Sequence, residues 1–245
     1  MPKISNALKT HLEEEHHISP VSAYLKEIVY GGTDGIVTTF AVVGGFAGAQ
    51  SALSSLPLVS VVLFGLANLF ADGTSMGLSN FLSLRSEKDL YRTQRHKELH
   101  EVRTNPQIEK EETEEILMTR GFTKKQAEEI TALYATNEQY WTDFMMNYEL
   151  ELPNPESENP VFTGLATFIA FIAFGFIPLI PYLFLRGVGS NFVLSCVGTT
   201  VGLIILGFFR WKVTSQTLLR SVGEILLLGG VSASIAYFVG TFFRI

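Results

Sequence analysis

The stretch from Leu58 to Leu84, LVSVVLFGLANLFADGTSMGLSNFLSL, decides the fold class of this chain. It is apolar throughout except for scattered small polar residues and one carboxylate, Asp72, near its middle. A helix rises about 1.5 Å per residue and the hydrocarbon core of a bilayer is about 30 Å thick, so the stretch is long enough to cross a membrane. It therefore predicts a transmembrane helix.

Four more apolar runs lie on either side of this stretch, and together they predict an all-α membrane protein with five transmembrane helices. The expected spans are Ile28–Ala49, Leu58–Leu84, Phe162–Leu185, Phe192–Phe209 and Leu218–Phe243. We expect Pro178 and Pro181 to bend the third span, because neighbouring helices can satisfy the backbone groups that a proline frees.

The charged residues are concentrated in one segment of the chain. Residues 86–160 hold 17 acidic and 9 basic residues, a net charge of −8, whereas the rest of the chain has a net charge of +2. Such asymmetry predicts two environments for one chain. The acidic segment is expected to form a soluble helical insert between the second and third spans, with helices over Glu87–His100, Ile108–Arg120, Thr123–Tyr134 and Asn137–Leu150.

Basic residues near the ends of the spans predict the orientation in the membrane. They follow the second span and lie between the fourth and fifth spans: Arg85, Lys88, Arg92, Arg95, Arg210, Lys212 and Arg220. We therefore expect a cytosolic tail over residues 1–23, spans one and two within 24–85, a cytosolic metal-binding insert over 86–160 and spans three to five within 161–245.

Two carboxylates, Asp34 and Asp72, fall inside expected spans. A charge at mid-membrane costs about 2.5–3.5 kcal/mol on insertion scales, so an ion pathway or a proton relay is the first interpretation. Asn68, Asp72 and Met76 are spaced by four residues and share a helix face. Amide, carboxylate and thioether groups suit a divalent transition metal. The alternative is a carboxylate that only hydrogen-bonds a neighbouring helix.

Glycines recur four residues apart in the expected spans, which allows close helix packing. The pairs are Gly31/Gly35, Gly44/Gly48, Gly73/Gly77 and Gly198/Gly202. Their concentration in the first two spans predicts that those helices form either the centre of the bundle or a dimer interface.

The acidic insert contains candidate metal ligands. Glu98 with Glu101, and Glu109 with Glu112, are three residues apart, so each pair can present two carboxylates from one helix face. The last expected helix of the insert adds two thioethers and a carboxylate, Met145, Met146 and Glu149. A solvated acidic helix is the alternative for the glutamates. His96 and His100 also share a face and are weaker candidates.

The remaining motifs do not favour catalysis. Glu13–His17 contains two Glu-x-x-His spacings, which build di-iron sites in four-helix bundles, but matching partners are missing. Gly31–Gly35 is glycine-rich but lacks the lysine of a phosphate loop. The sequence therefore predicts neither an enzyme, nor a prosthetic group, nor nucleic-acid binding.

Four separated segments resemble the vacuolar iron transporter family. Tyr30–Ala41 and Gly65–Gly77 resemble its first two helices, Asp143–Met146 is similar to the end of its cytosolic metal-binding domain, and Pro178–Tyr182 is similar to its third helix. The resemblance covers nearly the whole chain from about Tyr24 onward.

The resemblance implies a homodimer of five-helix subunits in a lipid bilayer. Fe²⁺, and often Mn²⁺, would leave the cytosol along the dimer interface in exchange for protons, for metal detoxification and homeostasis. Asp34 would be the essential carboxylate of the first helix and Met76 the thioether of the second. The insert's ligands would be Glu98, Glu101, Glu109, Glu112, Met145, Met146 and Glu149.

The chain departs from the plant-type and fungal-type members at Asn68, where they carry Glu. We hypothesise that Asp72, one turn away, supplies the missing charge. Oxygen and thioether ligands do not separate Fe²⁺ from Mn²⁺, Co²⁺ or Zn²⁺. The absence of a targeting segment and the Asn68 variant favour a prokaryotic plasma membrane over a vacuolar-type membrane. A membrane-tethered di-iron oxidase and a cytosolic metal sensor or buffer remain alternative functions.

Overall fold

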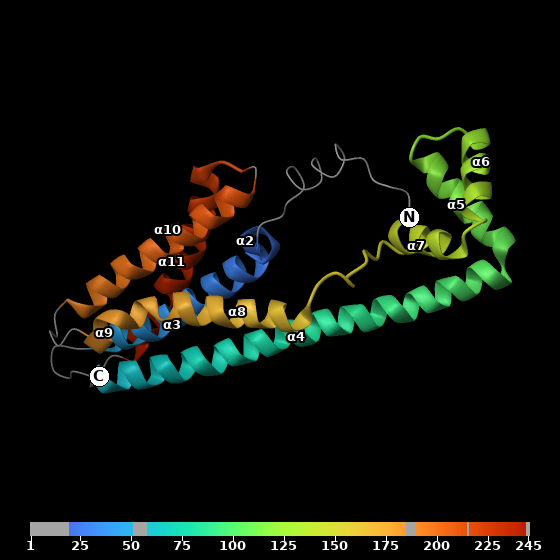
Figure 1. Cartoon of the computed structure of the whole chain (residues 1–245). Helices are drawn as coiled ribbons and strands as arrows, with labels where there is room; N and C mark the ends of the chain where they lie inside the picture. Colours follow the sequence, from blue (N-terminus) through green and yellow to red (C-terminus); the bar gives the residue numbers. More distant parts are fainter. Residues whose placement is uncertain (1–19, 51–57, 185–189, 215, 244–245) are drawn as a thin grey trace, which may run out of the picture. The chain divides into compact units, whose positions relative to one another are not determined.

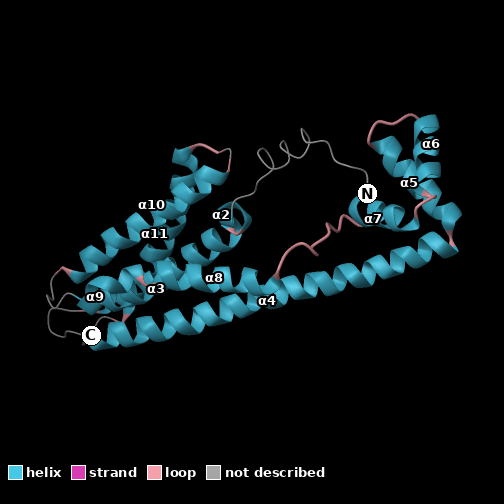
Figure 2. Cartoon of the chain, viewed as in Figure 1, coloured by secondary structure: helices cyan, strands magenta, loops and turns pink. Residues whose placement is uncertain are grey.

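The computed structural model describes residues 20–50, 58–184, 190–214 and 216–243, and these are helical without any strand (Figures 1 and 2). The prediction of an all-α protein is confirmed. The helices are α2 (Pro20–Ala23), α3 (Leu25–Ala49), α4 (Leu58–Thr104), α5 (Pro106–Thr119), α6 (Lys124–Tyr134), α7 (Glu138–Tyr148), α8 (Pro160–Gly175), the 3₁₀ turn η1 (Ile177–Leu179), α9 (Ile180–Phe184), α10 (Asn191–Val213) and α11 (Leu218–Phe242).

The chain divides into two compact units. The bundle unit comprises Met1–Asn80 and Val161–Ile245, and the insert unit comprises Phe81–Pro160. Helix α4 runs without interruption from the first unit into the second, so the expected span Leu58–Leu84 and the expected helix Glu87–His100 are parts of one helix. The N-terminal Glu13–His17 cluster lies outside the described residues.

Four helical segments of the described chain are long and apolar enough to cross a membrane: α4, the α8–α9 segment (Pro160–Phe184), α10 and α11. Helix α3 has 25 residues, about 37 Å of helix, which is sufficient length. Asp34, together with the threonines and glycines of α3, lowers its hydropathy. Four apolar segments fit a multi-pass membrane protein. That α3 also crosses the membrane, as the first of five spans, stays a prediction.

Close backbone contacts hold the bundle unit together. A Cβ atom on Gly35 would collide with the backbone of Phe171 in α8, and one on Gly48 would collide with the backbone of Tyr237 in α11. The other predicted pairs behave alike, since Gly73 and Gly77 contact α8 and Gly202 contacts Ile36 of α3. Residues from every predicted glycine pair thus pack against helices of the same chain.

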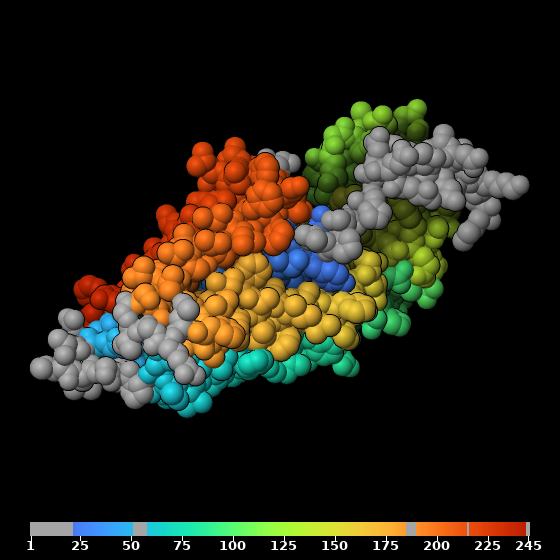
Figure 3. Space-filling model, turned by 60° about the vertical axis from the view of Figure 1, so that its left-hand side comes forward, coloured from blue at the N-terminus to red at the C-terminus, as the bar shows by residue number. Residues whose placement is uncertain are grey.

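The expected bend in the third span is present. Helix α8 ends at Gly175, and a 3₁₀ turn containing Pro178 joins it to α9, which contains Pro181. Figure 3 shows this segment beside α10 on one face of the bundle unit. The hydroxyl group of Ser195 in α10 donates a 2.8 Å hydrogen bond to the carbonyl oxygen of Pro178, which secures the turn.

The insert unit has its own hydrophobic core. Trp141 and Met145 of α7 pack with Leu117 of α5, Val102 of α4 and Ala127 of α6. Helix α6 begins with a complete capping box between Thr123 and Gln126, at the start of the helix expected from Thr123. These contacts bring the ends of α4, α5 and α7 together, which is where the acidic side chains converge.

Candidate metal centre

Three carboxylates of the insert unit converge on one point. Glu98 comes from α4, Glu109 from the first turn of α5, and Glu149 from the residue that ends α7. One oxygen of each lies within 4.8 Å of the others. Glu98 is 2% exposed and Glu109 is 5% exposed, whereas Glu149 is open to solvent. The group is therefore a carboxylate cluster with two buried walls and one exposed side.

One oxygen of each buried carboxyl group in this cluster lacks a partner, although the Glu98 and Glu109 side chains lie within hydrogen-bonding reach of each other. Oε1 of Glu98 and Oε2 of Glu109 are fully covered and accept no hydrogen bond from the described residues. Buried polar atoms are nearly always satisfied, and uncompensated buried charge is costly. A divalent cation among the three carboxylates would satisfy both oxygens at once, so the donor set fits a metal ion that prefers oxygen.

The cluster holds protons in the absence of a cation. Burial, then the neighbouring charges of Glu149 and Glu109, raise the pKa of Glu98 to about 8. Burial, then the charges of Glu112 and Glu109, raise the pKa of Glu149 to about 7. Burial also raises the pKa of Glu109. A metal ion that enters at neutral pH must therefore displace a proton.

The two predicted thioethers lie on α7, and both are fully buried. Met145 belongs to the core of the insert unit, and its backbone carbonyl accepts a hydrogen bond from the amide of Glu149. Met145 and Glu149 are thus successive on one helical turn. A thioether next to carboxylates adds a softer ligand to an oxygen site.

Glu101 and Glu112 lie at the edge of the cluster. Both are partly exposed, and both charges contribute to the raised pKa of Glu149. Glu101 also forms a 3.8 Å ion pair with Lys97. The predicted histidines, His96 and His100, are exposed and do not join a group of three possible ligands among the described residues.

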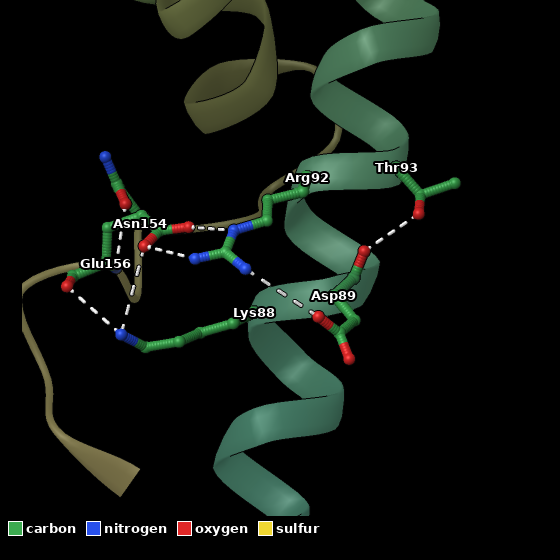
Figure 4. A network of polar contacts seen from close by, with 6 residues as sticks. All are labelled: Lys88, Asp89, Arg92, Thr93, Asn154 and Glu156. Carbon is green, nitrogen blue, oxygen red and sulfur yellow. Dashed lines mark hydrogen bonds and ion pairs between the residues drawn. The ribbon is translucent and has the colours of Figure 1, made fainter.

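Basic residues on another face of α4 hold the insert unit together. The guanidinium of Arg92 donates two hydrogen bonds of 2.6 and 2.9 Å to the carboxylate of Glu156, and the ammonium of Lys88 donates to the backbone carbonyl of Glu156 (Figure 4). Arg95 pairs with Asp143, and Arg103 pairs with Glu138. The residues that predicted orientation thus also anchor α7 and the segment that follows it.

Two of the predicted intramembrane residues, Asp34 and Asn68, line different grooves of the bundle unit. Asp34 lines a groove of about 520 Å³ between α3, α10 and α11. Asn68 lines a groove of about 810 Å³ between α3, α4 and α11. Asp72 is half-buried on α4. Met76 packs against the core cluster that contains Phe171.

This distribution follows from helix geometry. Residues four apart advance by about 400° around a helix, so each step turns the side chain by about 40°. Over the two steps from Asn68 to Met76 the direction changes by about 80°. Asn68 therefore opens toward α3 and α11, while Met76 packs into the core against α8.

One charged group in the Asp34 groove, Glu224, was not predicted from the sequence. Glu224 of α11 binds Arg210 of α10 at 2.6 Å and Arg220 at 3.0 Å, and both Arg210 and Glu224 line the groove. The four-residue spacing of Arg220 and Glu224 was a sequence signal for that pair. Nothing in the sequence indicated the Arg210 contact, because it joins two helices.

An all-helical bundle with four apolar segments, joined to a carboxylate and thioether cluster in a separate unit, defines a multi-pass membrane protein with a candidate metal centre. The family model described as "VIT family" matches residues 25–241. The chain belongs to this family, which confirms the resemblance found in its sequence.

Similar proteins match most of the length of the chain. It is 34% identical over 241 residues to a vacuolar iron transporter of Toxoplasma gondii, covering 95% of this chain and 78% of that protein. It is 31% identical over 230 residues to vacuolar iron transporter 1 of Arabidopsis thaliana, covering 94% and 89%. These relatives are transporters, which confirms the prediction that the chain is not an enzyme.

Proposed function

We propose that the chain exports a divalent transition metal, Fe²⁺ or Mn²⁺ or both, from the cytosol in exchange for protons. The observation that carries the proposal is the carboxylate cluster of Glu98, Glu109 and Glu149, with two buried oxygens that lack partners. The names of the relatives support iron as one transported ion.

The insert unit would gather the ion on the cytosolic side. The glutamates would replace part of its hydration shell with oxygen ligands, and the thioethers of Met145 and Met146 would complete the set. Glu101 and Glu112 would attract the ion to the exposed side. Because Glu98 and Glu149 hold protons near neutral pH, metal loading and proton release would be linked.

In the bundle unit, Asp34 and Asp72 would pass the ion through the bilayer, with Asn68 and Met76 along the route. Asp72 would supply the negative charge that other members carry at the position of Asn68. Asp72 lies one helical turn from Asn68 on α4, which supports this assignment. Five spans, with α3 as the first, would put the insert and the N-terminal tail in the cytosol.

A second copy of the chain would complete the route as a homodimer. The groove around Asn68 is lined largely by small residues of α3, α4 and α11, which permit close approach of another helix pair. We propose a prokaryotic plasma membrane as the location. A vacuolar-type membrane is the alternative that the names of the relatives support.

The purified chain in proteoliposomes tests this function. Flux of Fe²⁺, Mn²⁺, Co²⁺ and Zn²⁺ is measured with and without a proton gradient, and Asp72→Asn is compared with the matched variant Asp89→Asn. Asp89 is an exposed carboxylate of the same helix, in the insert unit. We expect a gradient-dependent flux that Asp72→Asn abolishes and Asp89→Asn preserves. No flux for any ion would refute transport, and a flux indifferent to the gradient would refute proton exchange.

A further inference from the structure

A buried hydrogen-bond chain joins the two kinds of ligand in the insert unit. The indole Nε1 of Trp141 donates to Oγ1 of Thr113 at 2.8 Å. The same hydroxyl lies 3.2 Å from Sδ of Met145 and 2.7 Å from the backbone oxygen of Glu109. Thr113 and Met145 are 0% exposed and Trp141 is 2% exposed, so water does not compete for these bonds.

The hydroxyl of Thr113 has one proton and two acceptors within reach. Its oxygen accepts the indole hydrogen, which leaves its own proton for either the Glu109 carbonyl or the Met145 sulfur. The first acceptor belongs to the backbone of one candidate ligand, and the second is the side-chain atom of another. Among the described residues, the Thr113 hydroxyl thus contacts both the backbone of Glu109 and the sulfur of Met145.

These bonds restrict the thioether. A methionine side chain has three rotatable bonds and fits many environments. A contact at 3.2 Å from a hydroxyl that is itself held by an indole selects one direction for Sδ. A ligand held in place before the ion arrives loses less conformational entropy when it binds, which raises affinity. Hydrogen bonds from neighbouring residues to a metal ligand commonly fix its orientation and thereby change metal affinity.

We infer that Thr113, held by Trp141, is a positioning residue that fixes the Met145 sulfur and thereby sets the preference of the centre for thioether-accepting ions over hard ions. The inference rests on the proposed metal centre, and it assigns to Thr113 a role in ion selection rather than in folding alone. The ligand types alone do not separate these ions, but a sulfur held in one direction adds a dependence on geometry. Co²⁺, which binds sulfur more strongly, depends more on the orientation of Sδ. Mn²⁺ depends mainly on the carboxylate oxygens.

The test uses the full chain in detergent and compares its affinities for Co²⁺ and Mn²⁺. Thr113→Val removes the hydroxyl while preserving the shape of the side chain, and Thr113→Ser restores a hydroxyl. Thr131→Val is the matched control, because Thr131 is a 1%-exposed threonine of the same unit whose hydroxyl lacks a partner among the described residues. We expect Thr113→Val to weaken Co²⁺ binding by about tenfold or more and Mn²⁺ binding by less than about threefold. Thr113→Ser and Thr131→Val should keep the wild-type ratio of the two affinities.

A double-mutant cycle with Met145→Leu separates positioning from stability. If Thr113 acts through the sulfur, Thr113→Val adds nothing to the loss of Co²⁺ affinity in Met145→Leu. Should Thr113→Val not fold, Trp141→Phe replaces it. It removes the indole donor that holds the hydroxyl, together with part of a buried core ring, and the same loss of Co²⁺ preference is expected.

The outcomes distinguish this inference from the function on which it rests. Absence of metal binding by the wild-type insert would overturn the proposed centre, and the inference with it. Normal binding by the wild type with equal losses for Co²⁺ and Mn²⁺ in Thr113→Val, or with additive losses in the cycle, would overturn the positioning role alone.

Discussion

Metal binding to the insert unit should strengthen steeply as the pH rises from 6 to 8. The pKa of Glu98 is about 8, so only about 1% of this buried carboxyl is ionised at pH 6, against half at pH 8. Because the ion requires the ionised form, this one group should change the apparent affinity by about 50-fold. Glu149, with a pKa of about 7, adds less than tenfold because it is exposed and screened.

The same shifts predict how many protons leave the protein. At pH 7 Glu98 is about nine-tenths protonated and Glu149 about half protonated, so each bound ion should release about one to one and a half protons. Isothermal titration calorimetry in buffers of different ionisation enthalpy measures this number directly. A second consequence concerns stability, because both pKa values are raised in the folded state. The metal-free insert should lose stability as the pH rises from about 5 to 8, and saturating metal should remove that loss.

Glu98→Gln tests whether Glu98 causes most of this pH dependence. The amide cannot ionise, so the affinity should fall and the remaining pH dependence should shrink to the contributions of Glu109 and Glu149. Glu87→Gln, an exposed glutamate of the same helix, should behave as wild type. An affinity that is constant from pH 6 to 8, with no proton released in any buffer, would refute this account of the cluster.

Two further substitutions test the packing that supports the sites. Gly35→Ala should lower the stability of the detergent-solubilised chain by about 1–3 kcal/mol, because its Cβ would collide with the backbone of Phe171. Gly230→Ala is the control, because Gly230 has open space around it. Equal melting temperatures for the two variants would contradict the packing of Gly35 against α8. Thr123→Ala should lower the free energy of unfolding by about 1 kcal/mol, because it removes the α6 capping box. Thr119→Ala on α5 is the control and should change the stability little. Calorimetry that finds Thr119→Ala the less stable variant would exclude the cap as a stabilising element.

Long apolar and amphipathic segments were predictable because their signal is local. The first expected span began at Ile28 and α3 begins at Leu25, while the fifth expected span and α11 share Leu218 as their first residue. The expected fourth span ended at Phe209 because hydropathy falls at Arg210 and Lys212. The helical hydrogen bonds of α10 continue beyond that point, to Val213. The prolines at 178 and 181 gave the break after α8 correctly.

The candidate sites were only partly predictable, because they depend on contacts between helices. Spacing on one helix was enough to nominate Glu98 and Glu109, but not to show that Glu149 joins them while Glu101 and Glu112 remain at the edge. The hydrogen bonds that link Trp141, Thr113 and Met145 had no signal in the sequence, since threonine on a helix most often bonds only its own backbone.

The division of the intramembrane residues between two grooves also lay beyond the sequence. Asn68, Asp72 and Met76 share a stripe on a helix drawn alone, but the neighbours of that stripe change along its length. The position of α11 beside α3 separates the groove of Asp34 from that of Asn68, and no periodicity within α3 or α4 specifies it.

The concentration dependence of the initial Fe²⁺ flux in proteoliposomes tests the central claim most directly, because it separates a gathering site from the pathway. If the insert gathers the ion and Asp34 carries it, Glu98→Gln should raise the Fe²⁺ concentration for half-maximal flux while the maximal flux stays near wild type. Asp34→Asn should abolish flux at every concentration. A Glu98→Gln variant with an unchanged half-maximal concentration, or an Asp34→Asn variant that still transports Fe²⁺, would contradict the account.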